Sequence, residues 1–110
     1  RVGKKILATG NGRCNLDNLT ASRNDYNSPS FVMPALNKFS PQSNLEFFKS
    51  LGLLTVADSE GRVYPRSNSA SSVLDALRFE VEKLGVRIIF EKVEEISKKE
   101  VLSRICPYHF

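Results

Sequence analysis

The chain contains few of the residues that build disulfide-stabilised or metal-stabilised folds. Its 110 residues include two cysteines, one histidine and no tryptophan. Cys14 and Cys106 lie too far apart in sequence to indicate a disulfide framework, and one histidine without a C-x-x-C pair disfavours a zinc site. No apolar stretch approaches the ~20 residues that a membrane-spanning helix needs. With no signal-peptide pattern, these absences predict a cytoplasmic protein without a metal or a membrane partner.

The positive charge of the chain is concentrated near its N-terminus. Residues 1–24 hold five basic side chains and one acidic side chain, whereas residues 25–110 hold eleven of each, so the first segment accounts for the whole net charge of +4. The five are Arg1, Lys4, Lys5, Arg13 and Arg23. Positive charge confined to one segment indicates a local anionic partner, such as a phosphate.

This basic segment contains a glycine-rich loop. An apolar run at 6–8 predicts a short N-terminal strand, and Thr-Gly-Asn-Gly at 9–12 follows with residues that tolerate positive φ. Such a loop exposes successive backbone N–H groups, which can form an anion-binding concavity. Lys5 and Arg13 add positive charge beside it. A solvated basic loop with a glycine turn explains the same composition, and charge and glycine alone do not separate the two interpretations.

An irregular segment and two short helices are predicted next. Residues 16–29 are rich in Asn, Asp, Ser and Thr, whose side chains favour turns, so for Asn18 local turn bonding is a better interpretation than ligand binding. Helical spacing of apolar residues predicts a helix over 30–39. A capping-box pattern that begins at Ser43 predicts a second helix over 43–51.

Residues 53–65 predict a β-hairpin. Strand-like segments at 53–56 and 62–64 flank an Asp-Ser-Glu-Gly turn, and a proline follows the second of them. Tyr64 has two interpretations, one in which it reaches a ligand and one in which it covers the edge of the hairpin. The second fits an aromatic residue at such a position better.

The strongest helical pattern covers residues 70–84. Its apolar stripe consists of Ala70, Val73, Leu74, Leu77, Val81 and Leu84, and Ser69 and Gly85 are suitable capping residues. The β-branched run at 86–90 predicts a buried strand, and 92–96 a further short strand or bend. Helix, glycine and strand together are typical of the second half of a βαβ crossover. The tail from residue 98 predicts one or two helical turns.

Two blocks, GKKILATGNGRCN at 3–15 and GRVYPRSNSA at 61–70, resemble the aminoacetone oxidase-like family of NAD(P)/FAD-dependent bacterial flavoproteins. The resemblance extends from residue 1 to about residue 96. It implies an α/β fold in which 1–97 is a partial Rossmann-like FAD-binding domain. On this reading the helices and hairpin of 16–66 are an insert, and 98–110 is an atypical tail.

The resemblance also implies FAD as the cofactor, with NAD(P)H as the candidate electron donor of the whole enzyme. The implied FAD-binding residues are Lys5, Thr9, Gly10, Asn11, Gly12, Arg13, Cys14, Asn15 and Val93. Lys5 and Arg13 would offset negative charge on the pyrophosphate or on reduced flavin, and Asn15 would donate or accept a hydrogen bond near the flavin. Val93 would offer its backbone to the adenine. Cys14 more often packs as a small hydrophobe than acts as a redox thiol, because no resolving cysteine accompanies it.

A strand–G-x-G-x-x-G–helix unit, which binds the pyrophosphate in such domains, is not found in the 110 residues. We therefore expect the chain to be a fragment that starts just after the second strand of the domain and has little activity alone. Two alternatives remain open. One is a ligand-free domain that self-associates through the apolar faces of 70–84 and 86–90. The other, with less support, is a nucleic-acid-binding module that uses the basic loop, which lacks interleaved aromatic residues.

Overall fold

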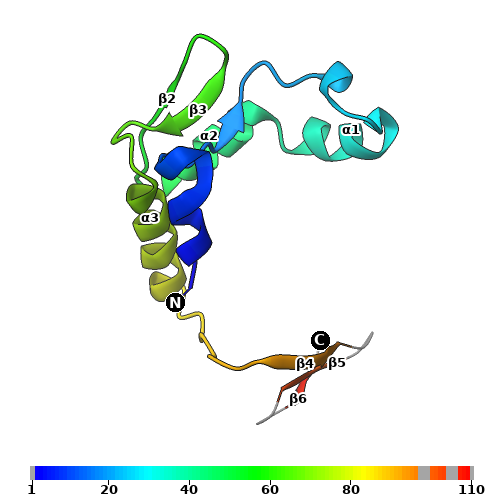
Figure 1. Cartoon of the computed structure of the whole chain (residues 1–110), viewed down its shortest axis with the longest axis vertical. Helices are drawn as coiled ribbons and strands as arrows, with labels where there is room; N and C mark the ends of the chain where they lie inside the picture. The colour runs from blue at the N-terminus through cyan, green and yellow to red at the C-terminus, as the bar shows by residue number, and fades with distance from the viewer. Residues whose placement is uncertain (1, 97–99, 104–106, 110) are drawn as a thin grey trace.

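The computed structural model describes residues 2–96, 100–103 and 107–109. It shows the expected α/β mixture, with two antiparallel sheets of strand order β1-β3-β2 and β4-β5-β6. Figure 1 shows the second sheet apart from the helices and the first sheet. In chain order the elements are η1 (Lys4–Gly12), β1 (Asp17–Asn18), η2 (Arg23–Asp25), α1 (Pro29–Lys38), α2 (Pro41–Ser50), β2 (Thr55–Ala57), β3 (Arg62–Pro65), α3 (Ala70–Lys83), β4 (Val93–Ile96), β5 (Glu100–Ser103) and β6 (Pro107–His109).

The N-terminal segment is helical, so the predicted strand is wrong. The 3-10 helix η1 starts after Gly3, whose carbonyl accepts a hydrogen bond from the N–H of Ile6 at 3.0 Å. Ile6 is half-buried, whereas Leu7 is exposed, so one face of the apolar run packs against the core and the other faces solvent. No neighbouring strand in the described residues offers a ladder to this segment, and helical hydrogen bonds satisfy its backbone locally.

Helix α3 packs against η1 and provides three of the buried core residues. Its predicted range is confirmed to within one residue, and the hydroxyl of Ser69 accepts a hydrogen bond from the N–H of Ser71 at the N-terminus. The first half of the predicted apolar stripe is buried and the second half is not. The buried core residues are Cys14, Leu53, Val63, Tyr64, Ala70, Val73 and Leu74. Burial therefore lies where α3 meets η1 and the hairpin.

Helices α1 and α2 both begin at a proline, earlier than the sequence pattern predicts. Pro29 and Pro41 occupy the first turns, where a missing N–H leaves no helical hydrogen bond unmade. Ser40 caps α2, because its hydroxyl accepts a hydrogen bond from the N–H of Ser43 at 3.2 Å. The predicted start at Ser43 is therefore wrong, since the N-cap is Ser40 and the helix begins at Pro41.

The predicted hairpin is confirmed as β2 and β3, and β3 is the central strand of the first sheet. Asp58 organises its turn by accepting hydrogen bonds from the backbone N–H groups of Glu60 and Arg62 and from the Arg62 guanidinium at 2.8 Å. The hydrogen bond from that guanidinium is the main reason why the pKa of Asp58 lies below its ordinary value. The turn therefore fixes the position of β3, which carries Val63 and Tyr64 toward the N-terminal loop.

The predicted strand at 86–90 is wrong, since these residues form no strand and their side chains are exposed. A β-branched apolar run needs a neighbouring strand to complete its ladder, and no described strand lies beside it. Beyond it, β4 agrees with the strand expected at 92–96. The helical turns expected in the tail are also wrong in its described parts, because β5 pairs with both β4 and β6. No helix in the described ranges has the length and apolarity that crossing a membrane requires.

Replacing Leu74 by Ala should destabilise the chain by ~2–5 kcal/mol, because the side chain is only 3% exposed and its removal leaves a cavity between α3 and η1. Leu84→Ala on the same helix is the control, and it should change stability by no more than about 0.5 kcal/mol, since Leu84 is 67% exposed. Urea unfolding followed by circular dichroism measures both. Equal losses for the two variants would contradict the position of the core.

Candidate anion-binding loop

A sharp bend interrupts η1 at the glycine-rich loop. Gly10 and Asn11 adopt left-handed backbone angles, with φ of 54° and 55°, and Gly12 follows with φ of 81°. Thr9, just before them, is extended, and its hydroxyl donates a hydrogen bond to the carbonyl of Ile6 at 2.7 Å. The positive φ values predicted from Gly-Asn-Gly are therefore confirmed. Their effect is a sharp bend in the chain near the end of η1.

The bend closes on itself through two backbone hydrogen bonds. The N–H of Arg13 donates to the carbonyl of Gly10 at 3.1 Å, and the N–H of Cys14 donates to the carbonyl of Thr9 at 2.9 Å. A side chain at Gly10 would collide with the backbone nitrogen of Asn15, so the backbone at residue 10 lies directly against the backbone at residue 15. These two N–H groups are already bonded within the loop. An anion would therefore rely more on neighbouring side chains than on a concavity of free N–H groups.

The loop is hydrogen-bonded to the sheet and packs against the core. The N–H of Leu16 donates to the carbonyl of Val63 on β3 at 2.8 Å. Cys14 has a φ of 58° and is buried, in a cluster that includes Leu53 and Val73. Its predicted packing as a small hydrophobe is confirmed. The loop thus has anchors on either side of Asn15, which is exposed.

The guanidinium of Arg13 lies over the ring of Tyr64, with its central carbon 4.3 Å from the ring centroid. Tyr64 is only 7% exposed, and Arg13 is half-buried. This is a cation–π contact within the usual distance. The sequence pattern identified both residues but not their contact, because no spacing rule relates a loop to a strand so far along the chain. Neither interpretation of Tyr64, as a ligand contact or as cover for the hairpin edge, predicted its contact with Arg13.

The loop carries uncompensated positive charge. Within the part of the chain that the structure describes, Lys5 and Arg13 form no ion pair, whereas Arg62 and Lys83 do. Lys5 is exposed to solvent and lies near the start of η1, five residues before Gly10. A half-buried guanidinium without a carboxylate beside it favours the binding of an anion.

The other predicted positions lie outside this loop. Val93 is on β4, which Figure 1 shows far from η1, so the structure does not bring it to the bend. Asn18 accepts hydrogen bonds from the N–H and hydroxyl of Thr20, which confirms local turn bonding for that residue. No group of three or more potential metal ligands occurs among the described residues.

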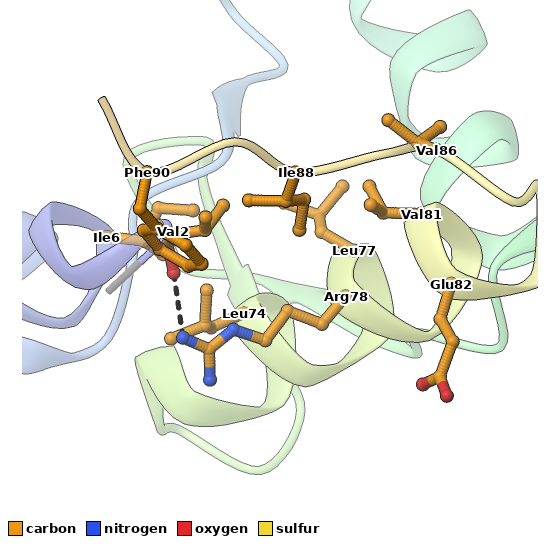
Figure 2. A pocket seen from close by; sticks show the side chains of 11 residues that line it. Val2, Ile6, Leu74, Leu77, Arg78, Val81, Glu82, Val86, Ile88 and Phe90 are labelled. Atoms are coloured by element: carbon orange, nitrogen blue, oxygen red, sulfur yellow. Dashed lines mark hydrogen bonds between the residues drawn. The ribbon is translucent and has the colours of Figure 1, made fainter. Parts of the chain in front are cut away.

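An apolar hollow lies away from the loop, over α3. It has a volume of about 480 Å³ and is open to solvent. Figure 2 shows Leu77 and Val81 of α3 facing Ile88 and Val86, while the Arg78 guanidinium donates a hydrogen bond to the carbonyl of Val2 at 2.7 Å. The remaining residues that line the hollow are Gly3, Ile6, Leu74, Glu82 and Phe90. An apolar surface of this kind suits protein packing better than a charged dinucleotide.

Comparison with known proteins gives one family and several relatives. The family model described as "HI0933-like protein Rossmann domain" matches residues 1–105. A 3-dehydro-bile acid delta(4,6)-reductase of Clostridium scindens is 47% identical over 79% of the chain and 22% of its own length. Ribosomal RNA dihydrouridine synthases of Haemophilus influenzae and Escherichia coli are 28% and 31% identical over 91% of the chain. The chain spans 22–26% of the length of these relatives.

Replacing Gly10 by Ala should destabilise the loop more than replacing Gly12 by Ala. Both variants place a side chain at positive φ, which costs roughly 1–2 kcal/mol. At Gly10 the new methyl group also collides with the backbone of Asn15, whereas at Gly12 the nearest atom is the Leu7 carbonyl oxygen at 4.0 Å. Thermal unfolding of the two variants measures the difference. A Gly10→Ala loss no larger than that of Gly12→Ala would show that the loop does not close as described.

Proposed function

The chain belongs to the family of the HI0933-like protein Rossmann domain, and on that premise we propose that it is the FAD-binding segment of a flavin-dependent oxidoreductase of the aminoacetone oxidase-like type. The observation that carries this proposal is the half-buried guanidinium of Arg13, which stands beside a positive-φ bend without a carboxylate partner. A dinucleotide carries a negatively charged pyrophosphate, and such a group can bind close to the backbone of a bend of this kind.

The residues of the loop fit the negative part of FAD. The isoalloxazine ring would supply the electron-transfer chemistry, and the protein supplies position and charge. Gly12 leaves room for the cofactor to approach the backbone, whereas Gly10 lets the bend close against Asn15. Arg13 and Lys5 offset the negative charge of the cofactor. The exposed amide of Asn15 can donate or accept a hydrogen bond at the same surface.

Thr9 and Cys14 have supporting roles in this proposal. The Thr9 carbonyl and the Cys14 N–H close the bend, and the Cys14 side chain holds it to the core. Asn11 provides the second left-handed residue. Val93 stays a candidate for the adenine contact through its backbone, which requires β4 to approach the loop when FAD binds.

The relatives suggest a reductive reaction. One is named as a reductase at the 4,6 positions of a bile acid, and two are named as synthases of dihydrouridine in ribosomal RNA. For the present protein we propose reduction of a carbon–carbon double bond, with NAD(P)H as the electron donor. These nucleotides are supplied in the cytoplasm, which is the compartment we propose.

A nucleic-acid-binding module fits the loop less well. Proteins that bind single strands stack bases on exposed aromatic rings. Tyr64, the aromatic residue in contact with Arg13, is buried and covered by the guanidinium. Its ring is therefore not free to stack on a base.

FAD binding tests the proposal directly. We expect the longest product that the gene encodes to purify with flavin, and the 110-residue chain to bind FAD weakly, because it contains no G-x-G-x-x-G sequence. Arg13→Gln in the longer product should weaken FAD binding roughly ten- to hundredfold, the loss expected for a hydrogen bond to a charged group. Flavin fluorescence during titration measures the affinity.

Arg23→Gln is the matched control for this experiment. Arg23 belongs to the same basic segment but lies on η2, exposed and outside the bend, so its replacement should leave FAD affinity within about twofold. Absence of flavin from the natively purified product would refute the proposal. Equal effects of the two substitutions would show that general positive charge, and not the loop, attracts the cofactor.

Self-association is a second candidate function, and the apolar hollow favours it. Val86, Ile88 and Phe90 expose apolar side chains over α3, with Phe90 77% exposed. If this surface joins two copies, the 110-residue chain should form dimers at micromolar concentration, and Phe90→Ser should shift it toward monomer. Light scattering after gel filtration measures the mass. A monomeric wild-type chain at the same concentration would exclude this function.

A further inference from the structure

Tyr64 and Arg13 come from different elements, and each is held in place independently of the other. Tyr64 lies on β3 between the buried Val63 and Pro65, in a strand paired on both sides by β1 and β2. Arg13 sits at the end of η1, where its N–H bonds to the carbonyl of Gly10. The strand therefore presents the ring as a fixed platform, and the loop places the guanidinium above it at 4.3 Å.

A free arginine side chain carries about 2 kcal/mol of rotamer entropy, which is lost when the side chain is ordered on an anion. Contact with a buried ring removes part of that loss before the ligand arrives. When a guanidinium stacks face to face on an aromatic ring, its N–H donors, which lie along its edge, stay free for other partners. The cation–π contact and the charge-assisted hydrogen bonds to an anion can therefore exist at the same time.

We propose that Tyr64 is a positioning residue for Arg13, which it holds ready to bind the negatively charged part of FAD. The inference rests on the proposed function, because it needs an anion at the loop. Tyr64 itself does not touch the cofactor. Its aromatic ring, and not its hydroxyl group, performs this role, so Phe should replace it and an aliphatic side chain should not.

The first test needs no ligand and uses the 110-residue chain. Protons above an aromatic ring are shifted upfield, so the Nε–H resonance of Arg13 should lie upfield of those of the exposed Arg23 and Arg66. Tyr64→Phe should keep that shift, and Tyr64→Leu should abolish it. An unshifted Arg13 resonance in the wild-type chain would overturn the inference without affecting the proposed function.

The second test measures FAD affinity in the longest encoded product. Tyr64→Leu should weaken binding about two- to thirtyfold, the range that corresponds to one cation–π contact, and Tyr64→Phe should bind like the wild type. In an Arg13→Gln background, Tyr64→Leu should cause no further loss, because its effect passes through Arg13. An equal loss in both backgrounds would show a merely structural role and overturn the inference.

The outcomes separate this inference from the function on which it rests. If Arg13→Gln leaves FAD affinity unchanged while the Arg13 resonance is shifted, the contact exists but the proposed function is wrong. If Arg13→Gln weakens binding while Tyr64→Leu does not, the function stands and the positioning role is wrong. Should Tyr64→Leu fail to fold, the wild-type resonance and the Tyr64→Phe affinity still decide the question.

Discussion

The closed bend at residues 10–14 is the constraint on which the rest of the structure depends. Gly10 must lie against the backbone of Asn15, and no other residue fits there. Once the chain turns at this point, Cys14 enters the core and Leu16 reaches Val63 on β3. The helical segment before the bend and the sheet after it are thereby held together. A single close backbone contact thus determines how two separate parts of the chain meet.

The elements that the sequence predicts correctly are those decided by local signals. Ser69 and Gly85 mark the limits of α3, because a cap and a left-handed glycine act within one turn of the helix. The hairpin is likewise fixed by Asp58, which bonds to three donors within four residues. Local chemistry of this kind can be recognised from residue order alone.

The wrong predictions concern segments whose structure depends on neighbours. The β-branched run at 86–90 has the composition of a strand, but a strand also needs a partner, and none of the described strands provides one. The run at 6–8 is too short to distinguish strand from helix by period, and its contact with α3 decides in favour of a helix. The candidate site shows the same contrast. The positive φ of Gly10 can be predicted from its residue type, whereas the Arg13–Tyr64 contact forms only once the chain is folded.

This division also separates the two halves of the proposed dinucleotide site. The half around Arg13 depends on a closed bend, a sheet hydrogen bond and a buried ring, all of which are formed within residues 2–83. The half around Val93 follows the exposed run at 86–90, and no described strand holds that run in place. In the proposed site, the half that recognises charge would therefore be preformed in this segment. Recognition of adenine by Val93 would require a further packing step that closes 86–96 onto the apolar face of α3. Burial of the exposed apolar residues Val86, Ile88 and Phe90 would drive that step, because covering them removes apolar surface from water.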